Sequence, residues 1–257
     1  MKWPRKKTPE GARARNDGDH ADFIIPWSAI DDEYVKQLDR GVGAELALVD
    51  SSDAIPNGLP DGWEGFNNPS AEKRVAAAHE LWAPLLRNMP LTRQFLFNRL
   101  LDVRLIRVGN DEPGLAYAIL SNETNMITIL VGYDPRFELE SPKYFLSIPH
   151  PLRKFIDGVH SSVETATLPH TAFPLFKSDM ETLDALEWSV VDSDAFVESG
   201  FKTPLDRLMM IHSSGGGAYL CVSPDLPGKA IFWRSDAPPV VEDFWTLYDL
   251  AVLAICA

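Results

Sequence analysis

The sequence predicts an α+β fold in which an antiparallel sheet packs against helices. Short runs rich in β-branched and aromatic residues follow one another with turn residues between them, and this pattern is typical of strands. Other segments repeat apolar residues at helical spacing. The turns are too short for the crossovers that parallel strands need, so we expect antiparallel pairing. With 257 residues, 45% of them apolar, the chain can bury a sizeable core.

The chain begins with two segments that carry little regular structure. Residues 1–20 are dominated by Pro, Gly and charged residues, with Trp3 as their one aromatic, so we expect a flexible basic tail. Residues 51–70 are dense in turn-forming residues and predict a long surface loop.

Two helices are expected next. Ser70 is a plausible N-cap, and the apolar residues after it recur at helical spacing over residues 75–85. A second, short helix is expected over residues 91–101, because Pro90 suits the first turn of a helix.

A three-stranded meander is predicted over residues 103–133, since turn residues separate the β-favouring runs 103–108, 115–120 and 125–133. The polar segment that follows contains Pro135 and Pro142. We therefore place a boundary near Lys143, between an N-terminal α+β region, residues 21–142, and a C-terminal α+β region, residues 143–257. The alternative is that the two regions form one domain.

The C-terminal region is expected to begin with an amphipathic helix after Pro151, followed by a strand-like run at residues 187–192. Three strands are predicted at residues 207–212, 218–222 and 230–234, joined by turns containing glycine. Residues 240–255 predict a closing helix on one face of these strands, which would leave the other face open. Its expected apolar residues are Phe244, Leu247, Ala251 and either Leu253 or Ile255.

Charge and composition limit the classes of partner. The net charge is −13, and it divides into +3 for residues 1–19 and −16 for the rest. An acidic body repels nucleic acids and anionic membranes and attracts a basic partner, although excess acid can also serve solubility alone. The apolar run that ends the chain is too short to span a bilayer, and no secretory signal is evident. Cys221 and Cys256 form no metal or disulfide pattern, so we expect a cytoplasmic protein. The sequence does not indicate an oligomeric state.

Metal sites and cofactors are not expected from the motifs. His79 and Glu80 begin like a zinc-protease helix, but Ala83 stands where the second histidine is needed. Three evenly spaced histidines lie beside helix ends or prolines, where we expect them to be exposed: His150, His160 and His170.

Catalytic motifs are incomplete as well. The run from His212 to Gly217 could offer Ser213 or Ser214 as a nucleophile, but no GxSxG elbow occurs, so a glycine turn between strands is the favoured interpretation. Gly228 and Lys229 lack the spacing of a phosphate-binding loop. A pair of carboxylates facing each other cannot be found from sequence alone.

The C-terminal region resembles the SUKH superfamily, also called the Smi/Knr-like family. The resemblance covers residues 143–257 and depends on a Pro-led helix, a glycine turn entering a strand, a further strand and a closing aromatic helix. The chain departs from the family pattern at Asp157, where Asn is common, and at Ala218, where an acid is common. The matching positions are Pro149, Leu152, Phe155, Gly217, Tyr219, Trp233 and Phe244.

The resemblance implies an immunity protein that binds and neutralises a cognate bacterial toxin, with no cofactor, metal or catalytic residue of its own. The alternatives are a small cytoplasmic hydrolase and a non-catalytic scaffold protein. Seven acids and no basic residue lie between Lys177 and Lys202, which suits a toxin with a basic surface. Because a tryptophan beside acids is a plausible binding hot spot, the predicted contact residues are Asp192, Asp194, Asp225, Trp233, Asp236, Glu242 and Asp243. The alternative for Trp233 is that its side chain belongs to the core.

Overall fold

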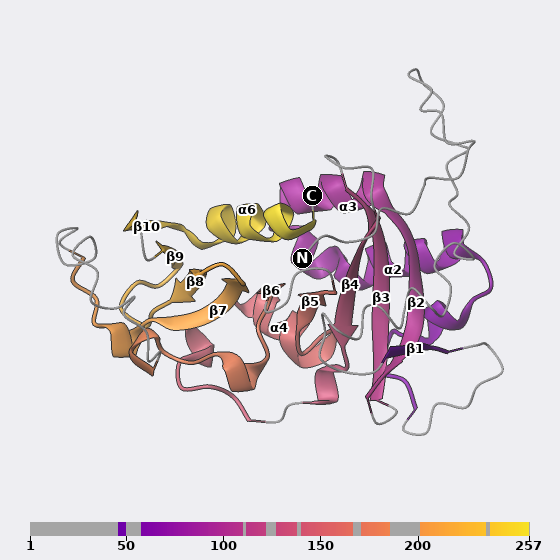
Figure 1. The fold of residues 1–257 in the computed structure, drawn as a ribbon, viewed down its shortest axis with the longest axis horizontal. Coiled ribbons are helices and arrows are strands. Elements are labelled where there is room, and N and C mark those ends of the chain that lie inside the picture. Colours follow the sequence, from indigo (N-terminus) through magenta and orange to yellow (C-terminus); the bar gives the residue numbers. More distant parts are fainter. Residues whose placement is uncertain are drawn as a thin grey trace, which may run out of the picture.

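The predicted α+β fold is confirmed by a computed structural model, in which one antiparallel sheet packs against helices (Figure 1). The structure describes residues 46–49, 58–109, 112–121, 127–137, 140–166, 171–185, 201–234 and 237–256. The predictions for residues 1–20, residues 187–200, His170 and Asp236 lie outside these ranges. None of the described helices is long and apolar enough to cross a membrane.

The strands pair in the order in which they follow one another along the chain, so the whole sheet is an antiparallel meander. The predicted strands in residues 103–133 and 207–234 are all present. The short strands β1, β5 and β6 were not predicted, because two or three residues carry no recognisable period. The strands are β1 Leu46–Leu48, β2 Leu100–Val108, β3 Glu112–Leu120, β4 Ile127–Tyr133, β5 Val163–Thr165, β6 Thr171–Ala172, β7 Met209–Ser214, β8 Ala218–Val222, β9 Lys229–Arg234 and β10 Ala237–Asp243.

Within the described residues, three of the four α-helices begin where the sequence predicts. The hydroxyl of Ser70 accepts a hydrogen bond from the backbone N–H of Lys73, which confirms Ser70 as the N-cap of the first of them. Prolines occupy the first turn of the next two. The four helices are α2 Ala71–Leu86, α3 Pro90–Arg99, α4 His150–Gly158 and α6 Phe244–Cys256.

The sheet and the core continue across the boundary predicted near Lys143. Strand β5 pairs with β4, with Glu164 opposite Val131. The larger apolar cluster contains residues as far apart as Val49 and Cys256. The two regions proposed from the sequence therefore share one sheet and one core.

Both faces of β2, β3 and β4 are buried. Side chains alternate between the two faces of a strand, and neighbouring residues such as Leu105 and Ile106 belong to different apolar clusters. Helix α2 packs on the face that bears Leu105 (Figure 1). This buried double-faced arrangement explains the nearly continuous apolar runs of these strands.

The loop prediction for residues 51–70 is wrong in one respect. Of this segment the structure describes residues 58–70, and there the side chains of Trp63 and Phe66 are buried in the core. A short 3-10 helix, Glu64–Asn67, carries Phe66. Turn residues identify the irregular backbone correctly, but they do not show that two aromatic side chains anchor it.

The closing helix starts later than predicted. Residues 237–243 form the edge strand β10, and α6 begins only at Phe244. The β-branched Val240 and Val241 suit a strand, and they pair with Phe232 and Ile231 of β9. The buried stripe of α6 also differs from the prediction and consists of Phe244, Tyr248, Asp249, Val252 and Cys256.

A buried carboxylate holds α6 against α3. The Asp249 oxygens accept hydrogen bonds from the backbone N–H groups of Leu91, at 2.9 Å, and Thr92, at 2.8 Å. The Thr92 hydroxyl donates in return to the Asp249 carbonyl oxygen at 3.2 Å. Asp249 thus caps the N-terminus of a helix that lies far from it in the sequence, and so positions α6.

Candidate binding groove

A groove of about 560 Å³ opens where three distant segments meet: the start of α4, the turn between β8 and β9, and the junction of β10 with α6. Its volume is in the range of protein pockets that hold a ligand or a partner side chain. Of the lining side chains, Leu146 is 80% exposed and Trp245 is half-buried. The lining residues are Leu146, Ser147, Ile148, Pro149, His150, Arg153, Ser223, Pro224, Pro227, Gly228, Asp243, Phe244 and Trp245.

Local hydrogen bonds hold the walls of this groove in place. The Arg153 Nε donates to the Ile148 carbonyl at 3.0 Å and ties α4 to the segment before it. The backbone N–H of Phe244 donates to the Gly228 carbonyl at 3.1 Å, which joins the start of α6 to the β8–β9 turn. Gly228 has a φ of +75°, a conformation that residues with a Cβ rarely adopt.

Asp243, one of the predicted contact residues, lines the groove and also caps α6. Its Oδ1 accepts hydrogen bonds from the backbone N–H groups of Trp245, at 3.0 Å, and Thr246, at 3.1 Å. The Thr246 hydroxyl donates to the same oxygen at 3.3 Å. Its other oxygen, Oδ2, has no hydrogen-bond partner within the described part of the chain.

The capping role of Asp243 can be separated from its charge. We expect Asp243→Ala to lower the free energy of unfolding by about 1 kcal/mol, because the first turn of α6 loses its acceptor. Asp243→Asn should change it much less, since Asn is as good an N-cap as Asp. Urea unfolding of both variants at neutral pH measures the difference. Equal losses in the two variants would show that charge, and not capping, matters for stability.

Two further predicted contact acids, Asp225 and Glu242, do not line the groove, although residues beside them in the sequence do. Both have a cationic neighbour. Glu242 lies beside Asp243, and its Oε1 is 3.8 Å from the Lys229 Nζ. Asp225 lies in the β8–β9 turn and forms a two-pronged hydrogen bond with the Arg207 guanidinium, which holds the pKa of Asp225 below its usual value. These pairs are exposed, so solvent and salt screen them strongly.

Trp233 does not provide contact surface for a partner. It is 1% exposed and stacks on Tyr219 in the core, with ring centroids 5.9 Å apart. A tryptophan in the middle of a strand whose neighbours bury both sides packs inward, so the prediction of a hot spot at Trp233 is wrong. Asp192, Asp194 and Asp236 lie outside the described residues. From the acidic run between Lys177 and Lys202, the described acids are Asp179, Glu181 and Asp184, all exposed.

The open face predicted for the C-terminal strands is absent from the described structure. Consecutive residues such as Ala230 and Ile231 are both buried, although they point to opposite faces. The segment before β7 pairs with the edge of that strand, through an isolated bridge between Thr182 and Met209. Within the C-terminal strands, the exposed sheet surface lies on the edge strand β10, where Val240 and Val241 are both exposed.

Sequence reasoning missed Trp245, the half-buried tryptophan that lines the groove. The signal was present in the spacing of α6, because Phe244, Tyr248, Val252 and Cys256 recur every four residues and form the buried stripe. Trp245 lies beside this stripe and two residues after Asp243. The predicted type of site, a tryptophan beside acids, therefore exists at this junction with a different tryptophan.

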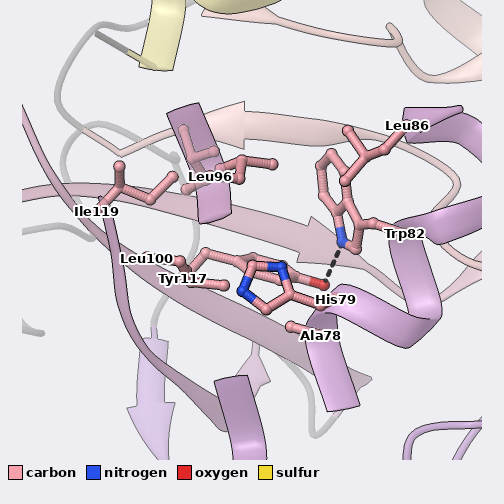
Figure 2. Close-up of a pocket in the computed structure, with 9 residues that line it drawn as sticks. Ala78, His79, Trp82, Leu86, Leu96, Leu100, Tyr117 and Ile119 are labelled. Atoms are coloured by element: carbon pink, nitrogen blue, oxygen red, sulfur yellow. Dashed lines mark hydrogen bonds between the residues drawn. The ribbon is translucent and has the colours of Figure 1, made fainter. Parts of the chain in front are cut away.

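A second cavity is too small to serve as a ligand site. It measures about 10 Å³, room for roughly one water molecule, and lies under α2 between apolar side chains. Figure 2 shows its lining, with the Trp82 indole donating a hydrogen bond to the Tyr117 hydroxyl at 3.0 Å. His79 at its edge stacks on Phe97, and burial lowers the pKa of His79.

The predicted exposure of the three histidines is wrong for His160, which is fully buried. Tyr117 accepts from Trp82, so its O–H donates to His160 Nε2 at 2.6 Å, and His160 Nδ1 donates to the Tyr133 carbonyl at 3.2 Å. Burial lowers the pKa of His160 to about 3, so the ring is neutral. His160 has a structural role, whereas His150 is exposed and lines the groove.

The serines of the glycine run act as turn acceptors. Ser213 Oγ accepts from the Gly215 N–H, and Ser214 Oγ accepts from the N–H groups of Gly216 and Ala218. The adjacent His212 is buried and bonded to the Ala172 carbonyl at 2.8 Å. Neither hydroxyl is bonded to a histidine, and the geometry matches the glycine turn that the sequence favours.

Within the described ranges no group of three His, Cys, Asp or Glu side chains could hold a metal ion. Comparison with known proteins identifies no relative: no protein-family model, curated protein or solved structure matches the chain.

Proposed function

We propose that this protein is a cytoplasmic immunity protein that binds and neutralises a cognate bacterial toxin, and that the groove between α4 and α6 is its contact surface. The observation that carries this proposal is the groove itself. It combines an exposed apolar side chain, Leu146, and a half-buried indole, Trp245, with the charged side chains of Arg153 and Asp243. Exposed large apolar side chains beside fixed polar groups are typical of protein-binding sites.

The positions that carry the SUKH resemblance agree with this proposal. Leu152, Phe155, Trp233 and Phe244 are all buried, as expected for residues that define a shared core. Helices α4 and α6, which bear Leu152, Phe155 and Phe244, also contribute residues to the groove lining. The elements that carry the SUKH resemblance in the core therefore also form part of the groove at the surface.

The net charge of −13 supports a basic partner at long range. At the groove, Asp225 and Glu242 are next to Arg207 and Lys229, so direct contact there involves mixed charges. We infer that the overall acidity speeds the encounter with the toxin, while the apolar side chains of the groove provide most of the affinity.

The test is neutralisation of the toxin encoded beside this gene. Co-expression of the protein should restore growth of cells that produce the toxin, and Leu146→Glu should abolish this protection, because a carboxylate would be buried at the contact. The matched control is Phe97→Glu on α3, since Phe97 is 66% exposed and does not line the groove.

In solution, we expect Leu146→Glu to weaken the complex about 30-fold or more, as loss of a hot-spot contact does. Calorimetric titration of toxin into each variant measures this change. Protection that persists with Leu146→Glu would place the contact elsewhere, and absence of binding to the adjacent gene product would contradict the proposed function.

A further inference from the structure

We propose that the α6 end of the groove is a subsite for one cationic side chain of the partner, preferably arginine, formed by the indole of Trp245 and the Oδ2 of Asp243. This inference rests on the proposed function only in taking the partner to be a protein. It names the chemistry that the groove selects.

The indole of Trp245 is held in one orientation before any partner binds. It makes T-shaped contacts with Phe244, at 5.0 Å between centroids, and Tyr248, at 6.3 Å. Both of these rings are fully buried and therefore fixed. Since the indole lines the groove while its neighbours immobilise it, little side-chain entropy is lost when a ligand contacts it.

The Asp243 carboxylate is fixed in the same way. Its Oδ1 is occupied by the first turn of α6, and the Asp243 backbone N–H donates to Glu242 Oε1 at 2.7 Å. The Oδ2 is left to accept a hydrogen bond from a ligand. The nearby amine of Lys229 lies 3.8 Å from the Glu242 carboxylate, and both groups are exposed. Such a pair is weak, so Lys229 competes little with a cationic ligand.

A ring face and a carboxylate oxygen attract the same kind of group. A cation is drawn to the negative face of an indole and donates a charge-assisted hydrogen bond to the carboxylate. Arginine satisfies both conditions best, because its planar guanidinium stacks on aromatic rings while it donates hydrogen bonds. A neutral side chain would lose the ion pair, and an acidic one would be repelled.

A positively charged side chain also belongs to the groove lining. Arg153 on α4 lines the groove, with its Nε bonded to the Ile148 carbonyl, and it repels a second cation in its vicinity. Pro149, Pro224 and Pro227 add apolar surface to the lining. We therefore expect a bound partner segment to carry an apolar residue next to an arginine, with the arginine at the α6 end.

The subsite can be tested without a toxin. The probes are three short peptides, acetylated and amidated, that contain a leucine followed by arginine, by neutral citrulline or by glutamate. NMR titration of the ¹⁵N-labelled protein follows the Trp245 indole N–H signal, assigned by its loss in Trp245→Phe. We expect saturable shifts of this signal with the arginine peptide. The affinity for the citrulline peptide should be at least about fivefold lower, and the glutamate peptide should not bind.

Two variants assign the interaction to the named groups. Asp243→Asn keeps the helix cap but removes the charge, and Trp245→Ala removes the ring; each should weaken arginine-peptide binding severalfold. Because Trp245→Ala lacks the indole signal, its titration follows the backbone N–H signals of the other groove residues. Leu250→Ala on α6, outside the groove, should leave it unchanged. Equal affinities for the arginine and citrulline peptides, shifts confined to other surfaces, or no saturable shift would each overturn the subsite.

This outcome is independent of the toxin experiment. Peptide binding without toxin neutralisation would keep the cationic subsite and reject the immunity function. Neutralisation lost in Leu146→Glu but unaffected by Asp243→Asn and Trp245→Ala would keep the function and reject the subsite.

Discussion

Replacement of Asp102 by Ala is expected to lower the free energy of unfolding by about 3–5 kcal/mol, because it leaves a buried arginine without its counter-ion. Asp102 on β2 receives two hydrogen bonds from Arg74 on α2, at 2.9 Å and 2.7 Å. The side chains are only 7% and 5% exposed, respectively. Asp102 Oδ1 also accepts a hydrogen bond from the Val103 backbone N–H at 2.7 Å, so the substitution removes the acceptor of that donor as well.

The double variant Arg74→Met with Asp102→Ala should recover part of this loss, since no unpaired charge is then buried. Urea unfolding at neutral pH of the two single variants and the double variant measures the coupling. The exposed pair provides the control, because Asp225→Ala removes a similar two-pronged ion pair and should have little effect. A loss for Asp102→Ala as small as for Asp225→Ala would show that the α2–β2 pair contributes little to stability.

Gly132→Ala is the second substitution with a large expected effect, a loss of about 3 kcal/mol. A Cβ at this position would lie 2.5 Å from His160 Cε1 and 2.7 Å from both ring nitrogens. The ring cannot move aside freely, because Tyr117 and the Tyr133 carbonyl hold its two nitrogens. Trp63 and Phe155 also pack against it, with ring centroids at 5.2 Å and 5.6 Å.

The cause of this loss can be isolated by removing the ring. His160→Ala is itself destabilising, since it opens a cavity and leaves Tyr117 without its acceptor. In that background, Gly132→Ala should cost almost nothing, because the space it needs is empty. Thermal unfolding of the two single variants and the double variant tests this. Additive losses would mean that the methyl group clashes with the backbone and not with His160.

Much of the secondary structure is encoded locally and could be predicted. Helix α2 has its N-cap at Ser70, and the strands β2, β3 and β4 follow the β-favouring runs of residues 103–133. These features depend on neighbours within a few residues, so a local pattern is sufficient to identify them. The prediction of the boundary between β10 and α6 was wrong, because apolar residues on both sides of this boundary fit a helical stripe.

The candidate site was predicted in kind but not in position. Asp243 lines the groove, yet the neighbouring tryptophan is Trp245 and not Trp233. Either ring beside an acid would satisfy the local pattern. The choice between them depends on which ring the α6 helix and the strands bury, and this is a property of packing between distant segments.

The sequence by itself determined the composition of this protein, its acidic charge, its local elements and the antiparallel order that short turns impose. Only the tertiary structure decided which histidine is buried, which tryptophan is exposed and where the groove opens. The groove walls come from residues 146–153, 223–228 and 243–245, and Asp249 brings α6 to α3 through hydrogen bonds to Leu91 and Thr92. Contacts across such separations depend on how the entire core packs, so no local pattern in the chain specifies them.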